Sequence, residues 1–449
     1  MHPQDDVTHP MVSIPFSKKK HYLTGIDWLL QGFDCMNKRA TGAGNSFQIV
    51  MELEGVPAED RVRDALDGFV KKFPVLGGRT RRDYNLAPYW EIPRRAHNTS
   101  SRLDVHRLED AAEAFPLLEA GVNAPFGNER EHVAFCLIHA GSNGHAAVKF
   151  DHRLFDAHGA EVFLGMFQRD WEKGGGCRWE SPPLEPAHLD QWRKRFEAGR
   201  NLNRALLRLV GDSPPRALPL DPAASREGFG FSVIRFDQQQ SREILQRAES
   251  EAGYLMAMPY TMALAVQALH GIFAGRGITA GDYIVPVTMD TRLPSDRPRE
   301  VFFNHVSLLL FRIRADQADD RSALLKSIKQ QMYDQAKAGL ARSIPDASLL
   351  MRILPLPAVE YLLKLYLKQR IASFCFSFLG DTGHMPDRFM ENKVRHSYHM
   401  TRVPVPPGLG VFFQHSRGSL NACLSYQRGL LGEAEVNRVL DALRSGLQG

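Results

Sequence analysis

The sequence has few cysteines and no long uncharged apolar run, and both features narrow the class of protein. Five cysteines among 449 residues lie far apart, in odd number and with no CxxC pair, at positions 35, 136, 177, 375 and 423. This pattern excludes a disulfide scaffold or zinc knuckle and is typical of a reducing compartment. No window reaches the roughly 18 uncharged apolar residues of a membrane-spanning helix. The polar N-terminus lacks the apolar core of a signal peptide, so we expect a cytoplasmic protein.

The charge pattern limits the partners. The net charge is +5, and no run of Lys and Arg carries the interleaved aromatics of a nucleic-acid surface. We therefore expect no nucleic-acid partner. A modest basic excess suits a phosphate-bearing cofactor or an acidic carrier protein, although solvated Lys and Arg side chains explain it equally well.

Residues 348–371 form the most apolar stretch of the chain. Arg352, two prolines, Glu360 and Lys364 interrupt it, which favours two helices that are buried or lie on the surface. Buried core is the favoured interpretation, and membrane contact is the alternative.

The order of the expected elements indicates two mixed α/β halves. Residues 211–230 contain four prolines and no periodicity, and we interpret them as a linker between an N-terminal half at 1–210 and a C-terminal half at 231–449. The expected elements of the first half are helices at 17–33, 57–74 and 157–176, a strand at 45–55, and hairpins at 77–93 and 132–150. Those of the second half are strands at 229–236, 282–292, 305–314 and 373–380, helices at 241–253, 260–277 and 321–340, a hairpin at 410–427 and a closing helix at 432–447.

One short stretch gathers residues that can carry chemistry. The segment "VKFDHRLFDAHGAEVF" (148–163) places His152, Asp156 and His158 within seven positions, where a strand passes into a helix. A zinc site formed by these residues, with or without His145, is one interpretation, but HxxxDxH is a weak match to zinc spacing. An exposed polar turn is the second.

A general base is the third interpretation of this stretch. Imidazole titrates near neutrality, and a nearby Asp that pairs with a distant Arg can fix the corner while the His faces a cleft. The chain has no GxSxG elbow and no cysteine in a motif, so a covalent acyl-enzyme is poorly supported. A base without a protein nucleophile points to direct transfer between two bound substrates.

The strand followed by His152-Arg153-Leu154-Phe155-Asp156 resembles the active-site motif of the HxxxD acyltransferase superfamily. That superfamily includes nonribosomal peptide synthetase condensation domains and chloramphenicol acetyltransferase. Other blocks follow in the family's order, at 64–82, 259–273, 285–313 and 376–383 and in the terminal helix. The resemblance implies an α/β fold of two chloramphenicol-acetyltransferase-like halves, a pseudo-dimer with an active-site tunnel between them.

The resemblance also implies roles for individual residues. His152 corresponds to the catalytic base, Asp156 to a structural Asp, and Arg292 to the Arg that pairs with it. Gly159 would let the donor or acceptor approach the start of the following helix. Asp151 stands where the family often has a first His, and a carboxylate there could raise the pKa of the base or reposition its ring. The implied substrate-lining candidates are Asp151, Asn304, His305 and Ser377.

By this resemblance, the protein is an acyltransferase in natural-product or lipid biosynthesis that forms an ester or amide. It would move an acyl group from acyl-coenzyme A, or from the phosphopantetheine of a carrier protein supplied in trans, to a hydroxyl or amine of a small-molecule acceptor. We expect a monomer with no bound cofactor and no metal. The alternatives are a catalytically inactive condensation-like module that docks a carrier protein, and a lipid acyltransferase acting at a membrane through 348–371.

Overall fold

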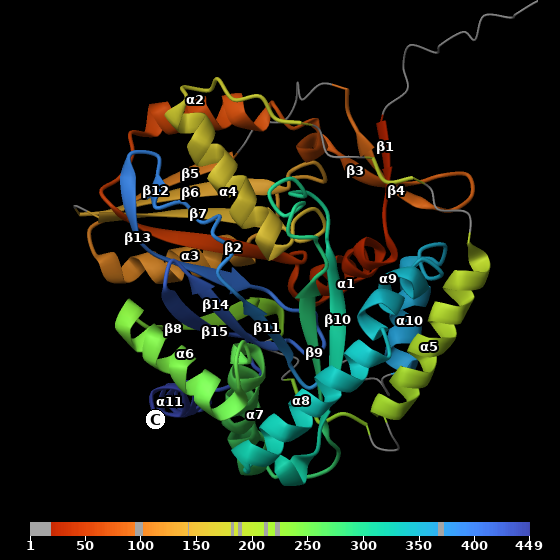
Figure 1. The fold of residues 1–449 in the computed structure, drawn as a ribbon. Coiled ribbons are helices and arrows are strands. Elements are labelled where there is room, and N and C mark those ends of the chain that lie inside the picture. Colours follow the sequence, from red (N-terminus) through yellow and green to blue (C-terminus); the bar gives the residue numbers. More distant parts are fainter. Residues whose placement is uncertain are drawn as a thin grey trace, which may run out of the picture.

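The computed structural model describes residues 19–94, 102–141, 143–180, 184–186, 191–210, 214–220, 225–366 and 372–449. These residues form two lobes, one above the other in Figure 1, and each lobe is built on a six-stranded sheet. The predicted mixed α/β fold of two halves is confirmed.

The first lobe carries the sheet with strand order β12-β13-β2-β7-β6-β5. All neighbouring strands in it are antiparallel except β5, which runs parallel to β6. The strands are β2 (Ser46–Glu54), β5 (Arg102–Leu108), β6 (Val133–Ala140), β7 (Asn143–Asp151), β12 (Arg388–Phe389) and β13 (Asn392–Thr401). A separate three-stranded sheet contains β1 (Lys19–Tyr22), β4 (Pro88–Ile92) and β3 (Arg79–Arg82).

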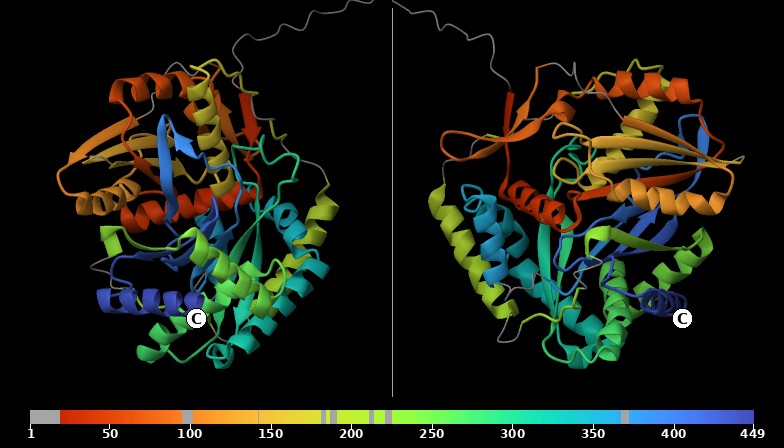
Figure 2. Two further views of the ribbon diagram at one scale, coloured as in Figure 1. Left: turned by 60° about the vertical axis from the view of Figure 1, so that its left-hand side comes forward. Right: turned by 180° about the vertical axis from the view of Figure 1, so that it is seen from behind.

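Both faces of the first sheet are buried, which explains why β2 and β7 are apolar almost throughout. One face, with Ile49 and Phe150, packs against α2 and α4, whereas the other, with Val50 and Ala147, packs against α3 and the second lobe. The helices of this lobe are α1 (Gly25–Thr41), α2 (Glu59–Val70), α3 (Ala114–Asn123) and α4 (Ala157–Glu172). Figure 2 shows α2 and α4 on the outer side of the sheet and α3 on the side facing the second lobe.

The second lobe carries the sheet with strand order β10-β9-β11-β14-β15-β8. β11 runs parallel to β14 and β9, and the other pairs are antiparallel. The strands are β8 (Phe229–Arg235), β9 (Tyr283–Asp290), β10 (Val306–Ile313), β11 (Cys375–Leu379), β14 (Leu409–Ser416) and β15 (Ser419–Gln427). The helices are α5 (Trp192–Val210), α6 (Gln238–Ala252), α7 (Ala257–Gly275), α8 (Arg321–Lys337), α9 (Leu340–Ser348), α10 (Leu356–Tyr366) and α11 (Glu433–Gln448).

The edge strand β10 is held by side chains of α8. Gln335 accepts from the backbone N–H of Leu310 and donates to its carbonyl, each at 2.9 Å. Gln331 does the same for Arg312, also at 2.9 Å. These bonds replace the strand partners that an edge lacks, so the position of β10 is fixed and the edge is covered.

The two lobes exchange segments, which corrects the predicted boundary. β12 and β13 follow residue 231 in the chain, yet they pair with the first sheet, because β13 completes the edge of β2 in an antiparallel register. The second lobe is therefore not a simple 231–449 unit. The loop after β9 also reaches the first lobe, where Phe303 stacks on His21 with ring centroids 3.7 Å apart. Of the predicted linker, 211–213 and 221–224 lie outside the described residues.

Most predicted elements are present, with some differences. The helix expected from residue 17 begins at Gly25, where Thr24 forms a capping box with Asp27, and β1 precedes it. Helices α3 and α5 and strands β5, β12 and β13 were not predicted. Of the two helices expected in 348–371, the described residues contain one, α10, since α9 ends at Ser348 and 367–371 lie outside the described residues. In α10, Val359 is buried while Tyr361 is exposed.

Within the described part of the chain, no single helix is both long and apolar enough to cross a membrane. α6 and α7 meet that test of length and composition only together, as a pair bent by 92°.

Candidate active site

The stretch singled out in the sequence forms a tight corner at the junction of the two lobes. β7 ends at Asp151, and α4 starts directly after Asp156, whose carboxylate accepts from the Gly159 N–H at 2.8 Å as the N-cap of the helix. His152 therefore lies between two rigid elements. Its own backbone is fixed as well, since its N–H donates to the Asn45 carbonyl at 3.1 Å and its carbonyl accepts from the Asn304 side-chain amide at 3.0 Å.

The His152 ring lies on the wall of a cavity. Its Nδ1 is buried and has no hydrogen-bond partner among the described residues, and the ring meets Phe47 edge-on with centroids 5.2 Å apart. Burial lowers the pKa of His152, and its own backbone and the charge of Asp156 offset part of that effect. The ring is consequently neutral near pH 7 and able to accept a proton.

Asp156 and Arg292 form a buried ion pair between the two lobes. Arg292 Nη2 lies 2.8 Å from Asp156 Oδ2, and the Arg292 side chain is completely buried. The same guanidinium donates to the Glu300 carbonyl at 2.9 Å and lies 3.1 Å from Asp290. Asp156 also accepts the His305 N–H at 3.0 Å. Every contact of Asp156 thus fixes geometry, and its carboxylate is engaged on all sides.

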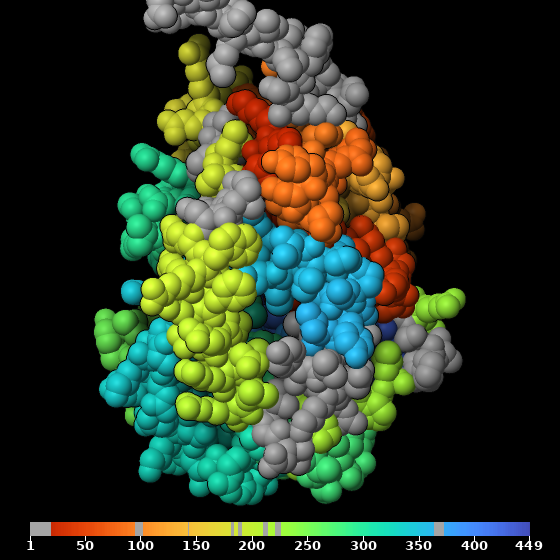
Figure 3. Space-filling view, turned by 90° about the vertical axis from the view of Figure 1, so that its right-hand side faces the viewer, coloured from red at the N-terminus to blue at the C-terminus, as the bar shows by residue number. Residues whose placement is uncertain are grey.

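A cavity of about 880 Å³ opens in front of His152. Its walls come from both lobes and are largely apolar, with Phe47, Ile26 and Met351 among the lining residues. Residues of α5 and α10 line it on one side, and Figure 3 shows the molecule hollowed between these two helices. The cavity can hold two substrates against one base.

We compared the chain with protein-family models, curated proteins and solved structures. No protein-family model and no curated protein matches the sequence. Among solved structures, the TRI3 trichothecene 15-O-acetyltransferase from Fusarium sporotrichioides aligns with a TM-score of 0.67 at 13% identity, covering 96% of this chain and 95% of that chain. The condensation domain of the monacolin K polyketide synthase MokA gives 0.64 at 14% identity, covering 96% and 97%. The epimerization domain from the third module of tyrocidine synthetase B gives 0.60 at 15%, covering 96% and 97%.

The chain has the condensation-domain fold. The likeness extends over 96% of the chain, so both lobes and their junction are included. At identities of 13 to 15% the likeness concerns the fold, and the chemistry depends on the residues at the site.

Asp151, the residue before the candidate base, is held by two polar side chains within this condensation-domain fold. Asp151 is buried between His132, whose Nδ1 lies 2.8 Å away, and Arg153, whose Nη2 lies 2.6 Å away. The other His132 nitrogen lies 3.0 Å from the Gly78 carbonyl, so both ring nitrogens of this buried side chain have polar partners. Burial would raise the pKa of Asp151, but Arg153 and His132 outweigh it and hold that pKa well below its usual value.

We expected Asp151 to raise the pKa of His152. Asp151 does act in that direction, but burial has the larger effect, so the pKa of His152 is lowered.

Of the four substrate-lining candidates, Ser377 lines the cavity, where its hydroxyl lies 3.0 Å from that of Thr288. The other three do not line it. Asp151 is enclosed by His132 and Arg153. Asn304 supports the His152 backbone, and the His305 ring turns toward Glu300 and the Phe302 carbonyl.

Gly159 makes room for protein rather than for substrate. A Cβ at this position would lie 2.1 Å from the Val301 carbonyl oxygen, so the loop after β9 occupies the space that was expected to admit the donor or acceptor. The glycine lets the second lobe approach the start of α4, close to the Asp156–Arg292 pair.

Sequence reasoning missed a second polar group in the cavity. Glu161 of α4 is buried, lies 3.1 Å from His399 of β13, and accepts from Gln414 of β14 at 2.9 Å and from the Thr382 hydroxyl. His399, Gln414 and Thr382 line the cavity wall, and Gln414 Oε1 is buried without a partner among the described residues. The partners of Glu161 come from distant segments of the chain, so no local pattern in the sequence marks this group.

The histidines and acids of the described residues form no cluster of three or more that could hold a metal ion. His145, which the zinc interpretation included, lies on β7 outside the cavity.

Proposed function

We propose that the protein is an acyltransferase in which His152 acts as general base for direct transfer from a thioester to a hydroxyl or amine. The observation that carries this proposal is the position of His152: a half-buried, neutral imidazole on the cavity wall, with backbone held by Asn45 and Asn304. The condensation-domain fold, which the chain shares with an acetyltransferase and with condensation domains, supports the same reaction class.

The environments of the other groups argue against a protein nucleophile. Asp156 is committed to Arg292, the Gly159 N–H and the His305 N–H. Cys375 and Cys423 also line the cavity, but burial raises the pKa of each thiol to about 12, so both stay protonated and unreactive. Of the other histidines on the cavity wall, His158 contacts the Arg297 carbonyl and His399 lies against Glu161, so we assign activation of the acceptor to His152.

The reaction then has few steps. His152 takes the proton of the acceptor hydroxyl or amine as the nucleophile attacks the thioester carbonyl. The tetrahedral intermediate collapses, the carbon–sulfur bond breaks, and the thiol leaves with the proton that His152 had accepted. Since thiols ionise near pH 8.5, the departing sulfur needs little further assistance. Much of the acceleration comes from holding donor and acceptor together in one cavity.

The lining of the cavity indicates the kind of acceptor. Largely apolar walls favour a hydrophobic small molecule, while the Glu161, His399 and Gln414 group offers hydrogen bonds to one polar substituent. We therefore propose a mainly hydrophobic alcohol or amine with a second polar group.

The test is a product screen. The purified protein is incubated with acyl-coenzyme A and acyl-carrier-protein thioesters together with mixed alcohols and amines, and new esters or amides are identified by mass spectrometry. We expect product from the wild type and from His145→Ala, which removes another histidine outside the cavity, and none from His152→Ala. Binding of a carrier protein without any product would instead support the docking-module alternative.

A further inference from the structure

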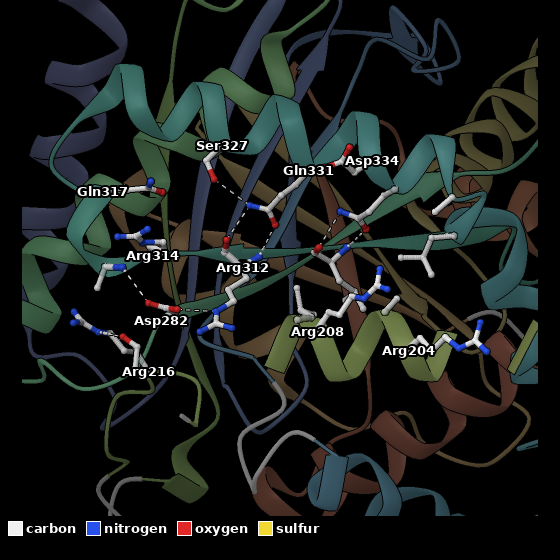
Figure 4. A pocket seen from close by; sticks show the side chains of 18 of the residues that line it. Arg204, Arg208, Arg216, Asp282, Arg312, Arg314, Gln317, Ser327, Gln331 and Asp334 are labelled. Atoms are coloured by element: carbon white, nitrogen blue, oxygen red, sulfur yellow. Dashed lines mark hydrogen bonds and ion pairs between the residues drawn. The ribbon is translucent and has the colours of Figure 1, made fainter. Parts of the chain in front are cut away.

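A second cleft, lined by five arginines and three aspartates, lies between α5, α8 and the ends of β9 and β10. Its volume is about 1420 Å³. Figure 4 shows the five arginines and two of the aspartates, Asp282 and Asp334, around the cleft, with Gln331 of α8 bonded to β10. The arginines are Arg204, Arg208, Arg216, Arg312 and Arg314, and the aspartates are Asp282, Asp316 and Asp334.

The five arginines differ in the partners that they already have within the protein. Arg216 is buried and bound to the carbonyls of Gly281 and Thr279, which makes it part of the wall. Arg312 pairs with Asp282 at 2.7 Å, and Arg314 pairs with Asp316 on the surface. An exposed pair of this kind contributes little and is easily exchanged for another anion.

Arg204 and Arg208 are the available cations. Both project from α5, one turn apart, both are exposed, and neither forms an ion pair with any described residue. Guanidinium groups bind phosphate oxygens in a bidentate manner, so this side of the cleft is suited to a phosphate-bearing ligand.

The cleft adjoins the catalytic cavity, and the two share lining residues. Alternate residues of β10 share the face that points away from the core of the second lobe, and along it Val306 and Leu308 line the cavity, Leu310 lines both spaces, and Arg312 lines the cleft. Leu209 of α5 also lines both. Val306 pairs with Asp290, near Arg292, and Arg312 lies six residues further along the strand. That separation is roughly 20 Å.

We propose that the arginine cleft binds the phosphates of a coenzyme A thioester, whose pantetheine arm follows the β9–β10 face to His152. This inference rests on the proposed function, since it concerns the donor of that same reaction. About 13 bonds join the proximal phosphorus to the sulfur, and an extended chain of that length reaches roughly 15 Å. Together with the reach of an arginine side chain, this length spans the distance from the cleft to the base.

The charge of the cleft favours coenzyme A over a carrier protein as the source of the thioester. Phosphopantetheine on a carrier protein brings a single phosphodiester, whereas coenzyme A brings a diphosphate and a 3′-phosphate. Arg204 and Arg208, which form no ion pair with the described residues, together with Arg314 in its exposed pair, match the ligand with several phosphates. A cleft of this size also leaves room for the nucleotide.

The test measures binding of coenzyme A by titration calorimetry to the full-length protein. We expect Arg204→Gln/Arg208→Gln to weaken this binding at least about tenfold, since charge-assisted hydrogen bonds are lost. Binding of pantetheine, which has no phosphate, should be unchanged by the same substitutions. Arg193→Gln is the matched control, because Arg193 lies on the same helix outside the cleft and pairs with Glu197.

The outcomes separate this inference from the proposed function. Equal affinity of the double variant and wild type for coenzyme A, or no binding of coenzyme A at all, would overturn the inference. Transfer from a carrier-bound thioester alone would overturn it and leave the acyltransferase proposal intact. Arginine-dependent binding of coenzyme A without transfer from any thioester would support the phosphate site while contradicting the proposed function.

Discussion

Replacing Asp156 with alanine should destabilise the protein through two separable effects. The first is the loss of the partner of Arg292, whose side chain is completely buried. Removing one member of a buried pair costs about 3–5 kcal/mol, and the remaining contact of Arg292 with Asp290 places this case near the lower end. The second is the loss of the α4 N-cap, which costs about 1 kcal/mol. We expect a total of about 4 kcal/mol.

Two further variants separate the loss of the ion pair from the loss of the helix N-cap. Asp156→Asn keeps a capping oxygen but removes the charge, so it should cost about 3 kcal/mol. Asp320→Ala removes an exposed N-cap aspartate from α8 and should cost about 1 kcal/mol. Urea unfolding measures all three. If Asp156→Ala cost no more than Asp320→Ala, the buried pair would contribute nothing and the account of how the corner is held would fail.

Two other predictions concern the same corner. Burial lowers the pKa of His152, so kcat/KM for transfer should rise through a midpoint below about 6.5 and then level off; a midpoint above that value would contradict the half-buried neutral base. Because the pKa of His152 is lower in the folded protein, the unfolded chain binds a proton at this ring more tightly, and the free energy of unfolding should fall as the pH drops below about 6.5. Gly159→Ala should destabilise the protein by about 1–3 kcal/mol in a thermal melt, because the added Cβ meets the Val301 carbonyl. Gly271→Ala in α7, where the space around the glycine is open, should instead stabilise the protein slightly. Equal effects of the two substitutions would refute the close packing at Gly159.

The corner around His152 was accessible to sequence reasoning because its determinants are local. A strand pattern, the HxxxD spacing and a glycine in the next helix turn lie within a dozen residues. The pairing of Asp156 with Arg292 came from the resemblance, and the structure places them 2.8 Å apart.

The elements and contacts that the sequence did not predict depend on segments that lie far apart in the chain. β13 was not predicted because buried polar residues, among them Ser397 and His399, obscure its alternation of apolar and polar residues. α5 is rich in arginine, and its role is visible only once β10 lies beside it. The partners of Glu161 come from three separate segments, so no spacing in the sequence could reveal the second polar group.

The most direct test of the central claim is the rate of acyl transfer by His152→Ala, measured in single turnover with the donor and acceptor that the product screen identifies. The account predicts a fall of about 10²–10⁴-fold for a protein whose unfolding transition matches the wild type. His145→Ala should keep the wild-type rate. A His152→Ala rate close to that of the wild type would contradict the assignment of His152 as the base.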